Sequence, residues 1–134
     1  MSAAAAVAAG RAAAESLMVD ACTVRRPTGT TPDPDTLEEV PTYEDIWSGQ
    51  CRIQRSGALS PREVSGAAGY EFGIGTVLAQ LPVASTGSRR GDVLEVTALA
   101  AESDPALLGL TATVMADMTK THATKRTLIC EEVS

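Results

Sequence analysis

Apolar and polar residues alternate with a period of two in about six short segments, and this pattern restricts the possible folds more than any other feature. Successive side chains of a β-strand point to opposite faces, so each segment predicts a strand with one apolar face. The segments start near positions 22, 51, 77, 94, 110 and 127. An antiparallel sandwich or a small barrel is the most economical way to bury six such faces.

Two of these segments carry more specific expectations. In the fifth, the alternation places Ala116 and Met118 on the same face as Leu110 and Val114. In the last, 127–133, the faces are mixed, which predicts a strand that is buried on both sides or lies at a sheet edge.

The chain of 134 residues suits one β domain, 21–134, preceded by an Ala-rich helix or arm, 1–20. Ser2 is a candidate N-cap for the helix, and only its last turn has much apolar bulk. A disordered arm and a helix that docks on another surface are therefore equally compatible with this segment. Its apolar run, 3–9, is too short to span a membrane and lacks the positively charged start of a signal peptide.

Three cysteines, Cys22, Cys51 and Cys130, are widely spaced and form no CxxC pair. Such spacing does not match a structural zinc site. Because all three fall within short apolar runs, we expect free, buried thiols that act as small hydrophobic side chains. This expectation fits a reducing cytosol, although one disulfide is also compatible with the sequence.

The charge balance argues against a protein that grips nucleic acid. Seventeen acidic residues against eleven basic ones give a net charge of −6. Binding to duplex phosphates needs a dense Lys/Arg surface, and stacking of single-stranded bases needs aromatic side chains. The chain contains only four aromatic residues, so the composition supports neither mode of binding.

Residues that could support catalysis are scarce. The one histidine, His122, lies in a polar segment, Lys120–Thr124, that predicts a surface turn. No nucleophile elbow, phosphate-binding glycine loop or dinucleotide-binding motif is present. We therefore predict that the chain is not an enzyme and that it uses no metal or cofactor.

Two long connections are candidates for contact with partners. The first, 27–44, has four prolines and a dense acidic cluster, and we expect a solvated hairpin loop there. The second, at about 56–75, is rich in glycine, and a loop of this length is usually functional or disordered. We predict a flexible segment whose channel or partner contacts include Ser60, Arg62, Glu63, Ser65 and Tyr70.

Small basic clusters could bind an acidic patch on a neighbouring subunit. The candidates for such inter-subunit charge contacts are Glu38 and Glu39 on the acidic side and Arg89, Arg90, Lys125 and Arg126 on the basic side. Each basic cluster is too small for a nucleic-acid groove but large enough to pair with a few carboxylates.

Several short motifs occur in a characteristic order. The chain reads ESLMVDACTVRRP at 15–27, IWSGQCRIQ at 46–54, LPV at 81–83, GDVLEV at 91–96, DPALLG at 104–109 and KTHATKRTL at 120–128. In order and spacing, over roughly residues 15–133, they resemble the small head–tail connector proteins of siphophages that infect actinobacteria, the head-completion or stopper group.

The resemblance implies a mainly β fold, a small antiparallel β-barrel of about six strands with an N-terminal α-helix and long loops. It implies a virion protein of the phage neck, assembled in the host cytoplasm, that forms a sixfold or twelvefold ring. The implied partners are the portal–adaptor complex on the head side and the tail terminator or tail tube on the tail side, with no membrane contact.

Such a ring extends the DNA channel and retains packaged DNA until the tail joins, and the DNA passes through without sequence-specific binding. An acidic protein suits this passage because it repels phosphates. A tail terminator ring is the alternative, followed by an unrelated small β-barrel binding module.

Overall fold

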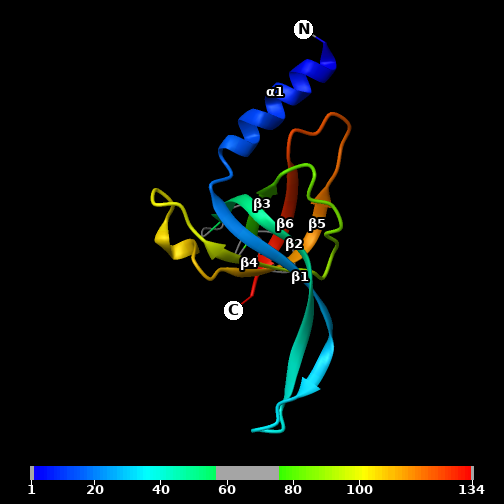
Figure 1. Ribbon diagram of the computed structural model, residues 1–134, viewed down its shortest axis with the longest axis vertical. Helices are drawn as coiled ribbons and strands as arrows, with labels where there is room; N and C mark the ends of the chain where they lie inside the picture. Colours follow the sequence, from blue (N-terminus) through cyan, green and yellow to red (C-terminus); the bar gives the residue numbers. More distant parts are fainter. Residues whose placement is uncertain (1, 57–75, 134) are drawn as a thin grey trace, which may run out of the picture.

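Six antiparallel strands close into a barrel in the order β1-β2-β3-β6-β5-β4 (Figure 1). The computed structural model describes residues 2–56 and 76–133. The strands are β1 (Asp20–Pro32), β2 (Glu39–Ser56), β3 (Thr76–Leu81), β4 (Val93–Ala98), β5 (Thr111–Met118) and β6 (Arg126–Glu132). The predicted mainly β fold is confirmed, and the barrel is realised rather than the sandwich.

The interior of the barrel is filled by small side chains. The buried cluster consists of Cys22, Val24, Cys51, Ile53, Val77, Ala79, Leu81, Leu94, Val96, Leu110, Ala112, Val114, Leu128 and Cys130. None of these is aromatic, because a barrel of only six strands has a narrow interior. All three cysteines are free and buried, which confirms the prediction made for them.

We expect the three thiols to resist alkylation in the folded protein. Burial raises the pKa of Cys130 to about 12, so only about 0.1 % of that thiol is ionised at pH 9. A hydrogen bond with Cys51, together with burial, also raises the pKa of Cys22. Intact mass after iodoacetamide treatment at pH 9 should show no adduct without denaturant and three adducts with it. An adduct on the folded chain would contradict this closed interior.

The first two strands continue well beyond the barrel as a two-stranded hairpin (Figure 1). The prediction of a loop over 27–44 was therefore wrong in part, since Pro27–Pro32 pairs with Glu39–Tyr43 and only 33–38 forms the turn. Prolines are tolerated here because the outer edges of the hairpin need no backbone N–H donor. Register shifts between Val24 and Arg25 and between Pro27 and Gly29 lie where the hairpin leaves the barrel.

Two expectations about the last strands are corrected by the sheet. A register shift between Val114 and Ala116 against β6 breaks the alternation of β5, so Ala116 and Met118 are exposed. Strand β6 lies between β3 and β5, not at an edge, and it buries one face through Leu128 and Cys130. The sequence could not reveal that closure leaves this barrel without an edge.

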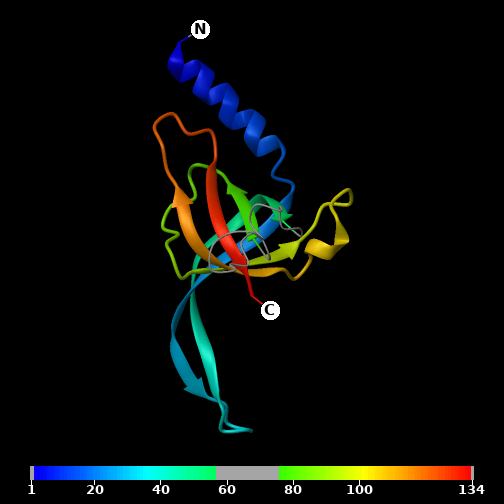
Figure 2. The same ribbon diagram turned by 180° about the vertical axis from the view of Figure 1, so that it is seen from behind.

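Helix α1 (Ala3–Ser16) extends from the end of the barrel opposite to the hairpin (Figure 2). Ser2 is the N-cap, as predicted, and its hydroxyl accepts a hydrogen bond from the Ala5 amide at 3.1 Å. The helix buries none of its residues. It contacts the β5–β6 loop, where Arg11 Nε donates to the Ala123 carbonyl at 3.0 Å.

Removing residues 1–16 should leave the barrel folded. Among the residues that the structure describes, the Arg11–Ala123 bond is the one side-chain hydrogen bond from the helix to the barrel, so we expect a loss of about 1 kcal/mol or less in the free energy of unfolding. Met18 is 3 % exposed, and truncating it to alanine should cost about 2 kcal/mol or more. Denaturant titration of the two variants checks this order, and a larger loss from the helix deletion would contradict it.

Candidate functional site

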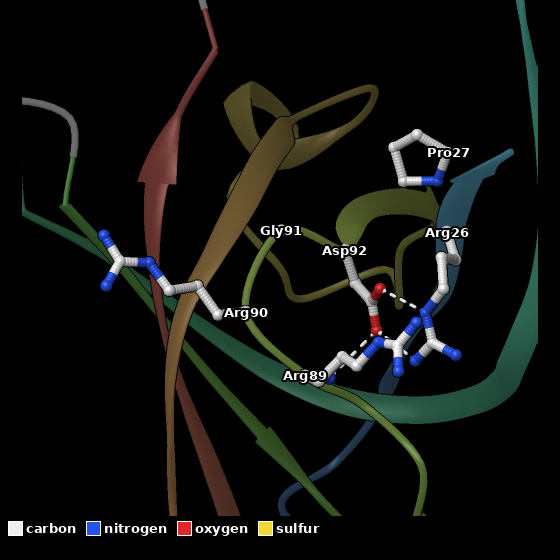
Figure 3. Close-up of a pocket in the computed structure, with 6 residues that line it drawn as sticks. All are labelled: Arg26, Pro27, Arg89, Arg90, Gly91 and Asp92. Carbon is white, nitrogen blue, oxygen red and sulfur yellow. Dashed lines mark hydrogen bonds and ion pairs between the residues drawn. The ribbon is translucent and has the colours of Figure 1, made fainter. Parts of the chain in front are cut away.

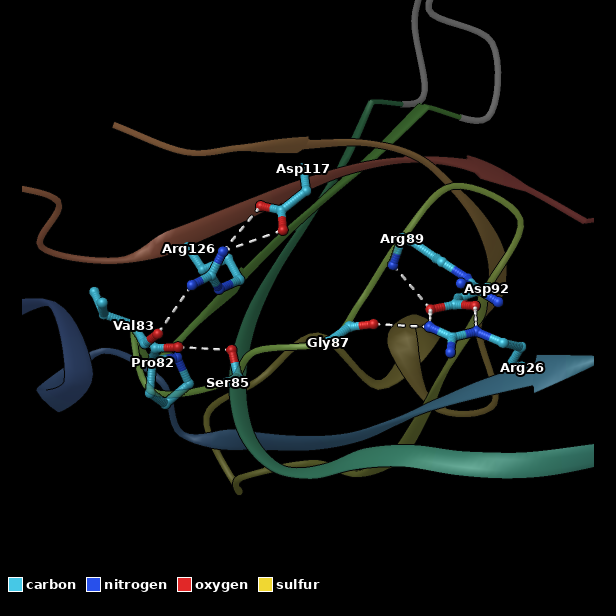
Figure 4. Close-up of polar contacts among 9 residues, drawn as sticks. All are labelled: Arg26, Pro82, Val83, Ser85, Gly87, Arg89, Asp92, Asp117 and Arg126. Carbon is cyan, nitrogen blue, oxygen red and sulfur yellow. Dashed lines mark hydrogen bonds and ion pairs between the residues drawn. The ribbon is translucent and has the colours of Figure 1, made fainter. Parts of the chain in front are cut away.

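A buried carboxylate organises the base of the hairpin. Asp92, just before β4, is 1 % exposed. Its oxygens accept hydrogen bonds from Arg26 Nε at 2.9 Å, from Arg26 Nη2 at 3.1 Å and from the Arg89 amide at 2.9 Å (Figure 4). This one side chain therefore ties β1 to the loop that precedes β4.

The loop from Pro82 to Gly91 is shaped to meet this carboxylate. Ser85 is buried and donates to the Pro82 carbonyl, and Arg26 Nη2 also donates to the Gly87 carbonyl at 2.7 Å. Gly87 and Gly91 have φ values of +100° and +96°, which side-chain-bearing residues rarely adopt. The loop thus bonds to both members of the Arg26–Asp92 pair: the Gly87 carbonyl accepts from Arg26, and the Arg89 amide donates to Asp92.

An open depression of about 280 Å³ lies at the base of the hairpin, and three arginines line it. We call it the arginine depression, and it is lined by Arg26, Pro27, Arg89, Arg90, Gly91 and Asp92. The Arg89 side chain lies alongside Arg26 and Asp92 in both close-ups. Figure 3 shows that the Arg90 side chain extends to the other side.

The depression has an excess of positive charge in a protein that is acidic overall. Hydrogen bonds with Asp92, and the nearby charges of Asp92 and Glu44, raise the pKa of Arg26 above its already high ordinary value. Arg89 and Arg90 are exposed, and neither side chain forms an ion pair with another described residue. Such a site suits a carboxylate or another anion, because guanidinium groups bind these in a bidentate manner.

The acidic residues predicted as contacts lie at the far end of the hairpin. We call residues 33–39 the acidic tip; Glu38 and Glu39 are exposed there. The turn is held by hydrogen bonds from the Asp33 amide to the Glu38 carbonyl and from the Leu37 amide to the Asp33 carbonyl, both 2.8 Å. The Asp33 carboxylate accepts from the Asp35 amide at 2.8 Å and so belongs to the turn itself.

The second predicted basic cluster is divided by the fold. Arg126 is bound within the chain, with Nη1 at 3.1 Å from Asp117 and Nη2 donating to the Val83 carbonyl at 3.1 Å (Figure 4). Lys125 is partly exposed beside it. An inter-subunit contact for these two residues stays a prediction. Within the chain, the Arg126 side chain is already bonded to Asp117 and to the Val83 carbonyl.

The predicted channel contacts Ser60, Arg62, Glu63, Ser65 and Tyr70 lie outside the described residues. His122 is exposed in the β5–β6 turn, with φ of 59°. Over 2–56 and 76–133, no three histidine, cysteine or acidic side chains are grouped so that they could hold a metal ion. Helix α1 is too short to cross a membrane, and no other described helix could do so.

Sequence reasoning missed Arg26 and Asp92, although a signal was available. Asp92 is in phase with Leu94 and Val96, so the alternation that identifies β4 also points this carboxylate inward. A buried carboxylate needs a charged or hydrogen-bonding partner. The choice of Arg26 depends on strand pairing across 66 positions of the chain, which the local pattern does not contain.

The fold and this site define a small antiparallel β-barrel protein with a projecting hairpin and a basic depression at its base. Residues 10–131 match a protein family described as a family of unknown function, DUF6093, and the chain belongs to this family. No curated protein matches the chain significantly. The solution structure of protein SF1141 from Shigella flexneri 2a is similar, with a TM-score of 0.55 and 22 % identity over 86 % of this chain and 92 % of that one. That likeness shows a shared fold.

Replacing Asp92 with alanine should destabilise the protein more than an equivalent change at the surface. The variant loses three hydrogen bonds, two of them to a charged group, and we expect a loss of about 2–3 kcal/mol in the free energy of unfolding. Asp104→Ala is the control because Asp104 caps only an exposed turn, at a cost of about 1 kcal/mol. Equal unfolding midpoints for the two variants would contradict the role of Asp92.

Proposed function

We propose that this chain is a structural protein of a phage neck, a ring-forming head-to-tail connector of the stopper or head-completion group. The ordered motifs over 15–133 support this class, and the observed β-barrel agrees with the fold that the resemblance implies. The proposed ring extends the DNA channel and retains packaged DNA until the tail joins.

One structural observation carries the proposal: two elements project from opposite ends of the barrel with little support from it (Figure 1). Helix α1 buries no residue, and Pro27–Pro32 of the hairpin is exposed throughout. Short isolated helices and isolated two-stranded hairpins are only marginally stable in water. Neighbours in an assembly would stabilise both by binding them.

The acidic composition supports passage of DNA rather than capture of it. A net charge of −6 repels phosphates, so an assembled ring would present a surface to which DNA does not adhere. In this proposal DNA makes no sequence-specific contact and no reaction is catalysed. The ring, sixfold or twelvefold, sits in the virion between the portal–adaptor complex and the tail terminator or tail tube, after assembly in the host cytoplasm.

Deleting the gene from the phage genome that encodes this chain should abolish infectivity and leave heads and tails unjoined. Heads that lack the connector should lose packaged DNA, because nothing closes the channel before the tail attaches. Electron microscopy and nuclease protection of the packaged DNA measure both effects, and the chain supplied in trans is the control.

The same experiment separates the alternatives. Tails of uncontrolled length attached to no head would indicate a tail terminator, because that ring ends tail growth. Normal, infectious particles after deletion would refute a neck role altogether. Immunogold labelling of wild-type particles should place the chain at the head–tail junction, and label on the tail tip or the capsid faces would contradict the proposal.

A further inference from the structure

We infer that the arginine depression binds the acidic tip of a second copy of this chain, so that protomers join head to tail. This inference deepens the ring function proposed above and rests on it. It assigns one interface of that ring to two described surfaces of the same chain.

The depression has the chemistry of a carboxylate receptor. Asp92 neutralises Arg26, which leaves the charges of Arg89 and Arg90 without an ionic partner among the described residues. The backbone of Arg89 is held by its hydrogen bond to Asp92, so this part of the receptor is pre-organised. Two exposed guanidinium groups can each take a carboxylate in a bidentate geometry.

The acidic tip has the complementary chemistry. No basic residue occurs between Arg26 and Arg52, and the tip itself contains Asp33, Asp35, Glu38 and Glu39. Hydrogen bonds across the turn hold its backbone, and the carboxylates of Glu38 and Glu39 are exposed. The tip can therefore present these two charges to a basic surface without being ordered first.

A second feature of the tip points to a covering partner. Leu37 is 79 % exposed and adopts a φ of 61°, a conformation in which glycine or asparagine would be unstrained. In the isolated chain, this leucine exposes apolar surface to water and holds a strained backbone conformation, and both are unfavourable. Burial against a neighbour would remove the apolar part of that cost.

The tip cannot reach the depression of its own chain. Arg26 lies at the base of the hairpin and Pro32 at its end, six residues further along an extended strand, or about 20 Å. The hairpin runs away from the barrel in both views (Figure 2). The contact must therefore join two copies, and because it uses different surfaces on each copy, it can repeat until a ring closes.

A pair of charge-reversed variants of the full chain tests the interface. Arg89→Glu with Arg90→Glu reverses the depression, and Glu38→Lys with Glu39→Lys reverses the tip. Each variant alone would oppose like charges, so we expect its self-association to weaken by about tenfold or more in sedimentation experiments. An equimolar mixture restores both contacts, since each tip then meets a depression of opposite charge, and it should assemble into alternating oligomers.

The control is Lys120→Glu with Thr119→Glu and Thr121→Glu, three exposed residues of the β5–β6 loop that are not predicted contacts. It changes the net charge by the same amount as the double arginine variant and should associate like the wild type. Circular dichroism verifies that each variant is folded, and the exposed tip variant tests the interface even if the depression variant does not fold. If the Arg89 and Arg90 variant is unfolded, Arg89→Gln with Arg90→Gln replaces it. Added salt should weaken wild-type association, because the interface is charged and open to solvent.

Three results would overturn the inference: a wild-type chain that stays monomeric at millimolar concentration, single variants that associate like the wild type, or a mixture that fails to associate when each component is folded. If the tip binds another neck protein instead of a second copy, the wild-type chain alone will stay monomeric. The deletion phenotype is independent of these measurements. A neck phenotype together with any of the three results would leave the proposed function standing and reject only this interface.

Discussion

Backbone pairing between β1 and β4 closes the sheet into a barrel, and the rest of the structure depends on that closure. The paired residues run from Ala21 opposite Ala98 to Arg25 opposite Val93. Closure satisfies the backbone groups of what would otherwise be two edge strands. It also leaves a narrow interior that accepts cysteine, alanine, valine and leucine. The low aromatic content is therefore compatible with a complete core, and Trp47 packs only partly against it.

Buried carboxylates at the starts of two strands attach the loops to this barrel. Asp20, at the start of β1, accepts hydrogen bonds from the Ala100 amide at 3.0 Å and from the Ser103 hydroxyl. Asp92 does the same before β4, where it holds Arg26 and the backbone of Arg89. The positions of Arg26 and Arg89 at the base of the hairpin therefore depend on Asp92, a carboxylate that is itself buried.

The features that local pattern predicts well are those with a strict period and a clear boundary. Alternation located five of the six strands, a β-like run with mixed faces located β6, and Ser2 located the start of α1, because these signals involve neighbouring residues. Prolines led to the prediction of a loop over 27–44, since the sequence does not reveal that Pro27, Pro32 and Pro41 belong to the two paired strands of a hairpin. The register shift in β5 was equally hidden, because a bulge is defined by the partner strand.

The sequence by itself determined that the chain is mainly β, that its thiols are small core residues, and that its surface is acidic. These properties follow from residue type and spacing alone. Only the tertiary structure decided that the sheet closes, that the acidic residues at 33–39 stand at the end of a projecting hairpin, and that Arg26, Arg89 and Asp92 meet. Each of these depends on pairing between distant segments, and many sequences with the same alternation could pair their strands differently.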